Sequence, residues 1–176
     1  MTRRLVALSL GAWLLALLPD SAVHGAELPL RKAGLWEMKL VRTGSPVPEM
    51  TMQHCTDETT DRDMSTASSP LSKEICSRHE VKQTAAGYVS DSVCSVAGVS
   101  VTSHADISGD FNSAYTVKTV SHSEGGVAGS HEATVTIEAK WLGACKPGQK
   151  PGDIVMPGGF KLNIKDAEKL KGLLPK

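Results

Sequence analysis

The stretch that decides the fold is residues 75–95, ICSRHEVKQTAAGYVSDSVCS. Two runs of strand-forming residues flank a turn that we centre on Ala85, and Gly87 suits the positive φ of a bulged turn. Folded in this register, the hairpin places Cys76 opposite Cys94. It also pairs Lys82 with Tyr88, Val81 with Val89 and His79 with Asp91. Because a slip of one residue would break every pair, the stretch predicts an antiparallel hairpin with a cross-strand disulfide.

A second hairpin follows along the chain. Residues 99–107 alternate apolar and polar side chains, Ser108-Gly109-Asp110 suits a three-residue loop, and 111–117 returns. This register pairs Ile107 with Phe111 and Val101 with Val117. The glycine-containing stretch 122–130 predicts an exposed, flexible loop, and 131–142 is the longest alternating stretch. One apolar face per strand predicts an antiparallel sheet with one solvated side.

The flanking regions predict fewer strands. Residues 34–41 and 50–55 are candidates for the first two strands, and 56–73 predict mostly loop with one helical turn near the start. The Pro- and Gly-containing stretch 143–159 predicts a loop, and 165–174 could form a short helix. We therefore predict an all-β fold, a curved antiparallel meander of about seven strands. It would close partway toward a barrel and carry a short C-terminal helix or tail, and a two-sheet sandwich is the alternative.

The cysteines extend this prediction. An even number of cysteines in a secreted chain predicts two disulfides, and no two of these have CxxC spacing. With the inner bond set by the hairpin, Cys55 remains for Cys145, which ties the end of the second strand to the end of the last. The same curling should bring Trp36 and Trp141 together, because they lie on the apolar faces of the first and last strands. The four cysteines are Cys55, Cys76, Cys94 and Cys145.

Residues 1–26 have the features of a secretory signal peptide. Two arginines precede the apolar run 5–18, Pro19 ends the run, and small residues follow. The run is shorter than the roughly 20 residues that a spanning helix needs, so we expect cleavage near Ala26 or Glu27. No later stretch is apolar enough to span a membrane, so we expect no membrane span after cleavage and a periplasmic or secreted location.

Charge and length bound the remaining possibilities. The chain has 19 Lys plus Arg and 19 Asp plus Glu, and it lacks the basic excess by which proteins neutralise nucleic-acid phosphates. We therefore expect no nucleic-acid partner. The 176 residues suit one folded domain. We divide them into the signal peptide 1–26, an antiparallel β domain 27–145, and a Pro- and Gly-containing loop and C-terminal tail 146–176.

Four short motifs occur in a distinctive order. They are G-L-W-E at 34–37, the strand 50–55 followed by Thr56, the central cysteine pair, and W-L-G-A-C at 141–145. Together they resemble a family of small secreted proteobacterial proteins of unknown function, with a G-L-W-E opening, four cysteines and a G-x-C closing. The resemblance covers roughly residues 33–145 and implies a periplasmic β-rich domain. It implies no activity, and the tail after Cys145 departs from the family pattern.

The side chains that could carry chemistry are few. Met50, Met52 and His54 lie on one strand face, and thioether and imidazole groups suit Cu(I); alternatively the two methionines are core residues. His79 opposite Asp91 could form an oriented base, or simply a surface cross-strand pair. No motif for a nucleophilic serine or a nucleotide is present, so we expect no cofactor and no catalytic residue that the sequence alone can name.

These observations favour a non-enzymatic protein. We expect it to bind an apolar ligand or an envelope partner in the concave face of the sheet. A Cu(I)-binding protein that uses Met50, Met52 and His54 is the first alternative, and a small hydrolase is the second. The doubled K-P-G of residues 146–152 predicts either an extended docking segment or a solvated linker.

Overall fold

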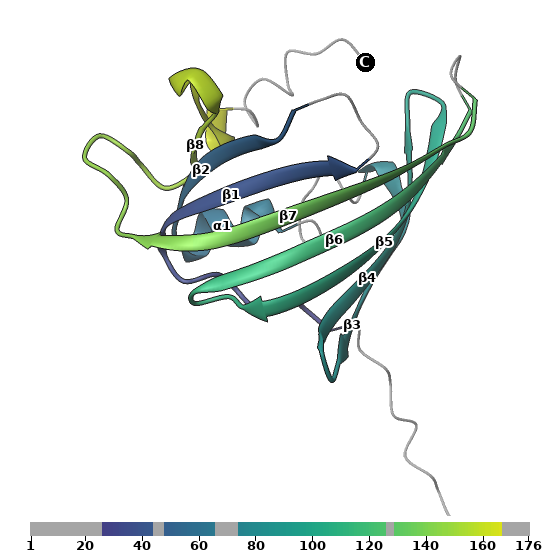
Figure 1. Cartoon of the computed structure of the whole chain (residues 1–176), viewed down its shortest axis with the longest axis horizontal. Coiled ribbons are helices and arrows are strands. Elements are labelled where there is room, and N and C mark those ends of the chain that lie inside the picture. The colour runs from purple at the N-terminus through teal and green to yellow at the C-terminus, as the bar shows by residue number, and fades with distance from the viewer. Residues whose placement is uncertain (1–25, 44–47, 66–73, 126–128, 167–176) are drawn as a thin grey trace, which may run out of the picture.

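The structure, a computed structural model, describes residues 26–43, 48–65, 74–125 and 129–166. The predicted signal peptide and most of the helix predicted at 165–174 lie outside these ranges. The described residues form one sheet of nine strands, paired antiparallel in the order β3-β4-β5-β6-β7-β1-β2-β8-β9. The all-β class is confirmed, and the sheet stays open, with β3 and β9 at its edges, instead of closing into a barrel (Figure 1).

Strands β1 to β7 form most of the sheet, and the elements that follow β7 have three residues each. The elements are β1 (Gly34–Thr43), β2 (Met50–Thr56), α1 (Glu58–Met64), β3 (Cys76–Thr84), β4 (Gly87–Val96), β5 (Val99–Asp110), β6 (Ala114–Glu124), β7 (His131–Gly143), β8 (Asp153–Val155), the 3-10 turn η1 (Pro157–Gly159) and β9 (Lys161–Asn163). Figure 1 shows the sheet curving strongly, with α1 on its inner side behind β1 and β7. This curvature gives the sheet a concave face.

The aromatic core lies where the first and last long strands meet. Trp36 is fully buried, and its ring centroid is 5.5 Å from that of Tyr115, which stacks on Phe111 at 4.9 Å. Trp36 pairs directly with Trp141 across β1 and β7, so the predicted approach of the two tryptophans is confirmed. The ring contacts of Tyr115 with Trp36 and with Phe111 each stabilise by about 0.5–1.5 kcal/mol beyond the area they bury.

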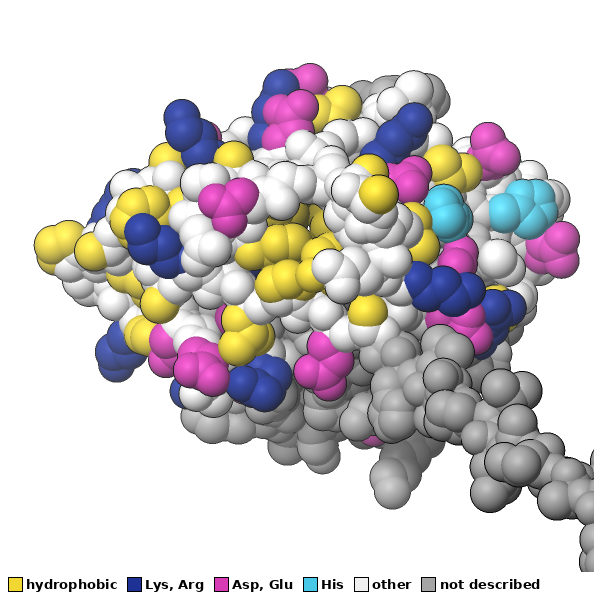
Figure 2. Space-filling view, turned by 90° about the horizontal axis from the view of Figure 1, so that it is seen from below, with side chains coloured by type: hydrophobic (Ala, Val, Ile, Leu, Met, Phe, Trp, Pro, Cys, Tyr) yellow, Lys and Arg dark blue, Asp and Glu magenta, His cyan; other side chains and the backbone are white. Residues whose placement is uncertain are grey.

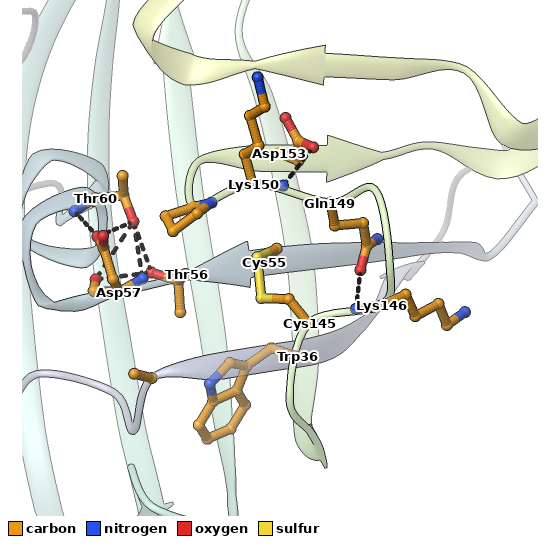
Figure 3. The surroundings of a disulfide bond; sticks show 12 residues. Trp36, Cys55, Thr56, Asp57, Thr60, Cys145, Lys146, Gln149, Lys150 and Asp153 are labelled. Carbon is orange, nitrogen blue, oxygen red and sulfur yellow. Dashed lines mark hydrogen bonds between the residues drawn. A yellow bond between two sulfur atoms is a disulfide. The ribbon is translucent and has the colours of Figure 1, made fainter.

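Both disulfides are present in the pairing that the sequence predicts. Cys76 bonds to Cys94 between β3 and β4, with 3.8 Å between the Cα atoms. Cys55, fully buried at the end of β2, bonds to Cys145 just after β7, and their Cα atoms are 5.4 Å apart (Figure 3). Within the described residues no cysteine is free. The second bond joins two strands that flank β1, so it fastens the core region around Trp36.

The register predicted for the first hairpin is right only at the cysteines. Thr84 pairs with Gly87 across a two-residue turn, which shifts the neighbouring pairs by one. A β-bulge between Cys76 and Arg78 takes up the extra residue and returns Cys76 to Cys94. The predicted pairs are replaced by Lys82 with Val89, Gln83 with Tyr88, Val81 with Ser90, Glu80 with Asp91 and His79 with Ser92.

The register predicted for the second hairpin is wrong. β5 continues to Asp110, the loop is Phe111-Asn112-Ser113, and β6 extends to Glu124 into the stretch predicted as a flexible loop. The Asp110 carboxylate accepts from the Asn112 N–H at 2.9 Å and the Ser113 hydroxyl at 2.8 Å, and this side-chain turn sets the loop three residues later. Ile107 therefore pairs with Val117 and Val101 with Ser123.

The predicted C-terminal loop contains ordered structure that joins the sheet. β8 pairs with β2, and β9 pairs with β8. Between Cys145 and β8, residues 146–149 and 150–153 form two successive turns closed by backbone hydrogen bonds of 3.0 Å, with Gly148 and Gly152 at the positive φ that a type II turn needs (Figure 3). The doubled K-P-G is thus a folded connection and not an extended segment.

Candidate functional site

The concave face of the sheet holds a pocket of about 510 Å³. It lies between the sheet, α1 and the segment that precedes β1, and most of its wall is apolar. Figure 2 shows apolar side chains gathered at the centre of one face of the molecule, with polar and charged side chains around them. Apolar residues of the pocket wall include Met38, Met64, Ile107, Phe111, Val117 and Ile137. A pocket of this size and polarity is typical of small-molecule sites.

The N-terminal segment, residues 26–33, forms one wall of the pocket. Two of its backbone N–H groups donate to backbone carbonyls, Ala26 to Val81 at 2.9 Å and Lys32 to Phe111 at 2.8 Å. Leu28, Pro29 and Arg31 of this segment line the pocket. The segment therefore spans from β3 to the β5–β6 loop and then enters β1 at Gly34.

A buried ion pair connects this segment to α1. The Arg31 backbone N–H donates to Oδ2 of Asp61 at 2.7 Å, and the guanidinium Nε donates to Oδ1 at 2.5 Å. The two side chains are only 8% and 6% exposed, respectively. The sequence analysis missed this pair, because 30 residues separate its members and no short pattern signals the contact. The ion pair joins the N-terminal segment to α1, and these two elements form the pocket walls on the side away from the sheet.

The helix that carries Asp61 begins with a capping box. Asp57 accepts from the Thr60 N–H at 2.8 Å, and the Thr60 hydroxyl accepts from the Asp57 N–H at 3.0 Å (Figure 3). The hydrogen bond from the Thr60 backbone lowers the pKa of the Asp57 carboxyl. The helical turn predicted near the start of residues 56–73 is present, and α1 extends it to Met64.

His54 lies inside the pocket wall without a hydrogen-bond partner. It is 6% exposed, and among the described residues neither ring nitrogen finds a partner. Burial, with a smaller contribution from the positive charge of Arg31, lowers the pKa of His54 from 6.5 to about 4. The imidazole is therefore neutral at neutral pH, with one donor nitrogen and one acceptor nitrogen.

The other two residues of the predicted copper site lie along the same strand. Met50 and Met52 are partly buried, and they pair with Leu40 and Met38 of β1. Met38 brings a further thioether to this face of the sheet. Among the described residues, no three His, Cys, Asp or Glu side chains cluster so as to hold a metal ion. A metal site here would therefore depend on thioether ligands.

The structure does not form the predicted pair of His79 and Asp91. Asp91 instead contacts His104 at 2.7 Å, and this hydrogen bond raises the pKa of His104 and lowers that of Asp91. His79 is hydrogen-bonded through Nε2 to the Ser90 hydroxyl at 3.2 Å, and both side chains line the pocket. The two-residue turn of the first hairpin causes this change, because it pairs His79 with Ser92 instead of Asp91.

The fold and its bonds define a class of protein. The chain is a small β domain, an open antiparallel sheet curved around an apolar pocket. Its two disulfides are typical of a protein in an oxidising, extracytoplasmic compartment. The described part of the chain has no helix long and apolar enough to cross a membrane.

The chain belongs to the DUF3617 family, proteins of unknown function, whose model matches residues 31–145. No curated protein and no solved structure matches the chain. The matched range begins at Arg31 and ends at Cys145, so it contains the buried ion pair and all four cysteines. β8 and β9 lie beyond it.

Proposed function

We propose that this is a periplasmic or secreted, non-enzymatic protein that binds an apolar ligand in the concave pocket. The apolar pocket of about 510 Å³ is the observation that carries the proposal. A ligand that covers apolar surface removes it from water, which is favourable by roughly 25 cal/mol for each Å² covered. An exposed apolar surface does not stabilise a folded domain, and such surfaces often mark binding sites.

The proposal can be tested by filling the pocket. Thr119 of β6 lines it, whereas Thr116 of the same strand faces the other side of the sheet, since Tyr115 and Val117 point inward. Thr119→Trp should therefore occupy the pocket, and Thr116→Trp is the matched control. The measurement is the fluorescence of phenylnaphthylamine, an apolar probe, and its displacement by dodecanol.

We expect the wild type and Thr116→Trp to bind the probe, and Thr119→Trp to lose most of the binding. Undiminished binding by Thr119→Trp would place the probe elsewhere and contradict the proposal. No binding by the folded wild type would also contradict it, and would favour the other occupant that we considered, a segment of an envelope protein.

A Cu(I) site is a second proposal, favoured by Met38 lying directly opposite Met52 on the face that also carries His54. Cu(I) prefers such soft ligands. The test is competition for Cu(I) with bicinchoninate. Met52→Leu should weaken copper retention, while Met64→Leu, in α1, should not. Equal retention by both variants, or none by the wild type, would contradict a copper site.

The hydrolase alternative now depends on Ser90 and His79, whose 3.2 Å contact is within reach of a nucleophile and its base. Hydrolysis of nitrophenyl esters by the wild type, lost in both Ser90→Ala and His79→Gln, would favour it. We expect no such activity, since the proposed role of the pocket is binding.

A further inference from the structure

One end of the pocket carries hydrogen-bonding groups that the protein leaves unsatisfied. His54 lines the pocket, is 6% exposed, and lacks a partner at both ring nitrogens among the described residues. A buried polar group without a partner destabilises the folded state, because it has lost its hydrogen bonds to water. Such a group in a pocket wall indicates that a ligand or water supplies the missing bond.

Arg31 offers a second donor at this end. Its backbone N–H and its Nε are used by Asp61, but its Nη1 donates to the Met38 sulfur at 3.6 Å. A thioether is a weak acceptor, so this guanidinium N–H would bind a carboxylate oxygen more strongly. Both Arg31 and Met38 line the pocket.

We infer that the ligand is an amphiphile with one carboxylate head and an apolar chain, whose head lies at His54 and Arg31. This inference rests on the proposed binding function and specifies its ligand class. The apolar wall fits the chain, and the donors without strong acceptors fit a carboxylate. A monocarboxylic fatty acid has this chemistry.

The local charges fit the same ligand. The charged and titratable groups around this end are Arg31 from the N-terminal segment, Asp61 from α1 and Tyr115 from β6, whose pKa is raised by burial. Arg31 and Asp61 neutralise one another, and the N–H of the His54 ring and the Nη1 of Arg31 would both donate to a carboxylate head.

The test compares dodecanoate with dodecanol in displacing phenylnaphthylamine, for the wild type and two variants. His54→Leu removes the unpartnered nitrogens and should fold, because the leucine leaves no hydrogen-bonding group unsatisfied at this position. His131→Leu, at an exposed histidine of β7 outside the pocket, is the control. We expect His54→Leu to weaken dodecanoate binding by about tenfold, the ratio that one charge-assisted hydrogen bond supplies. In His54→Leu the affinity for dodecanol should stay within about twofold of the wild type, and His131→Leu should change the affinity for neither compound.

Equal changes in the binding of both probes, or a wild type that binds dodecanol and not dodecanoate, would overturn the carboxylate inference while leaving the pocket proposal intact. A folded wild type that binds neither compound and no phenylnaphthylamine would overturn the proposed function itself.

Discussion

Removing the outer disulfide should destabilise the protein more than removing the inner one. The Cys55–Cys145 bond closes a sequence separation of 90, and the Cys76–Cys94 bond closes one of 18. A crosslink restricts the unfolded chain in proportion to the logarithm of the loop that it closes. In the chain-entropy model these lengths correspond to about 4.6 and about 3.2 kcal/mol at 25 °C. The difference of about 1.4 kcal/mol between the two is the quantity to test.

Urea unfolding of the two paired alanine variants, followed by tryptophan fluorescence, measures this difference. The signal should be large because Trp36 is fully buried and becomes exposed on unfolding. Cys55→Ala with Cys145→Ala should give the lower free energy of unfolding, and the loss of packing at buried Cys55 adds to the effect. An equal or larger loss from Cys76→Ala with Cys94→Ala would refute the reasoning from loop length.

Three further substitutions test contacts in the fold. Asp61→Asn should lower the free energy of unfolding in urea by about 3–5 kcal/mol, because it leaves the buried charge of Arg31 without a partner. Asp63→Asn, at an exposed position of the same helix, should change it by no more than about 0.5 kcal/mol. Gly34→Ala should lower the melting temperature more than Gly98→Ala, because both have positive φ but only at Gly34 would a Cβ lie 2.2 Å from the Gly143 carbonyl oxygen. The pKa of His104, measured by NMR, should lie above 6.5 and fall in Asp91→Asn; the small stability that this pair contributes is present below pH 6.5 and is lost as the pH rises through the raised value.

The sequence was sufficient for the features that repeat along the chain. Alternating side chains predicted the long strands, including residues 131–142 of β7, and two cysteines at opposite positions located the first hairpin. These signals depend on periodicity and on which face is buried, and both survive an error of one residue in the turn. The curled sheet and the meeting of Trp36 with Trp141 followed from the same reasoning.

The strand registers were predicted wrongly where a local feature changes the number of residues in a turn. The two-residue turn of the first hairpin and the side-chain turn at Asp110 each shift the register of a whole strand, yet neither has a periodic signature. β8 and β9 have three residues each, too few to show alternation, and their Pro and Gly neighbours predict a loop. The pair of Arg31 and Asp61 depends on the packing of two distant segments, so only the folded chain reveals it.

The sequence analysis named His54 as a candidate metal ligand. Its burial in the structure leads to a prediction about the stability of the protein at low pH. Because His54 binds its proton near pH 6.5 in the unfolded chain and only near pH 4 in the folded protein, the unfolded state binds more protons between these values. Stability should therefore be unaffected by this group above pH 6.5 and fall as the pH drops toward 4, by about 3 kcal/mol in all.

Urea unfolding of wild type and His54→Leu at pH 7 and pH 4.5 isolates this contribution, since the leucine variant keeps every other titrating group. The acid-induced loss of stability should be smaller in His54→Leu by about 2–3 kcal/mol, because the substituted side chain has no proton to bind. An identical loss in the two proteins would mean that His54 is protonated in the folded state with a near-normal pKa. His54 would then have a hydrogen-bond partner or contact solvent. The pocket would then hold no unsatisfied hydrogen-bonding group at this residue, which would contradict the inference about the ligand's head.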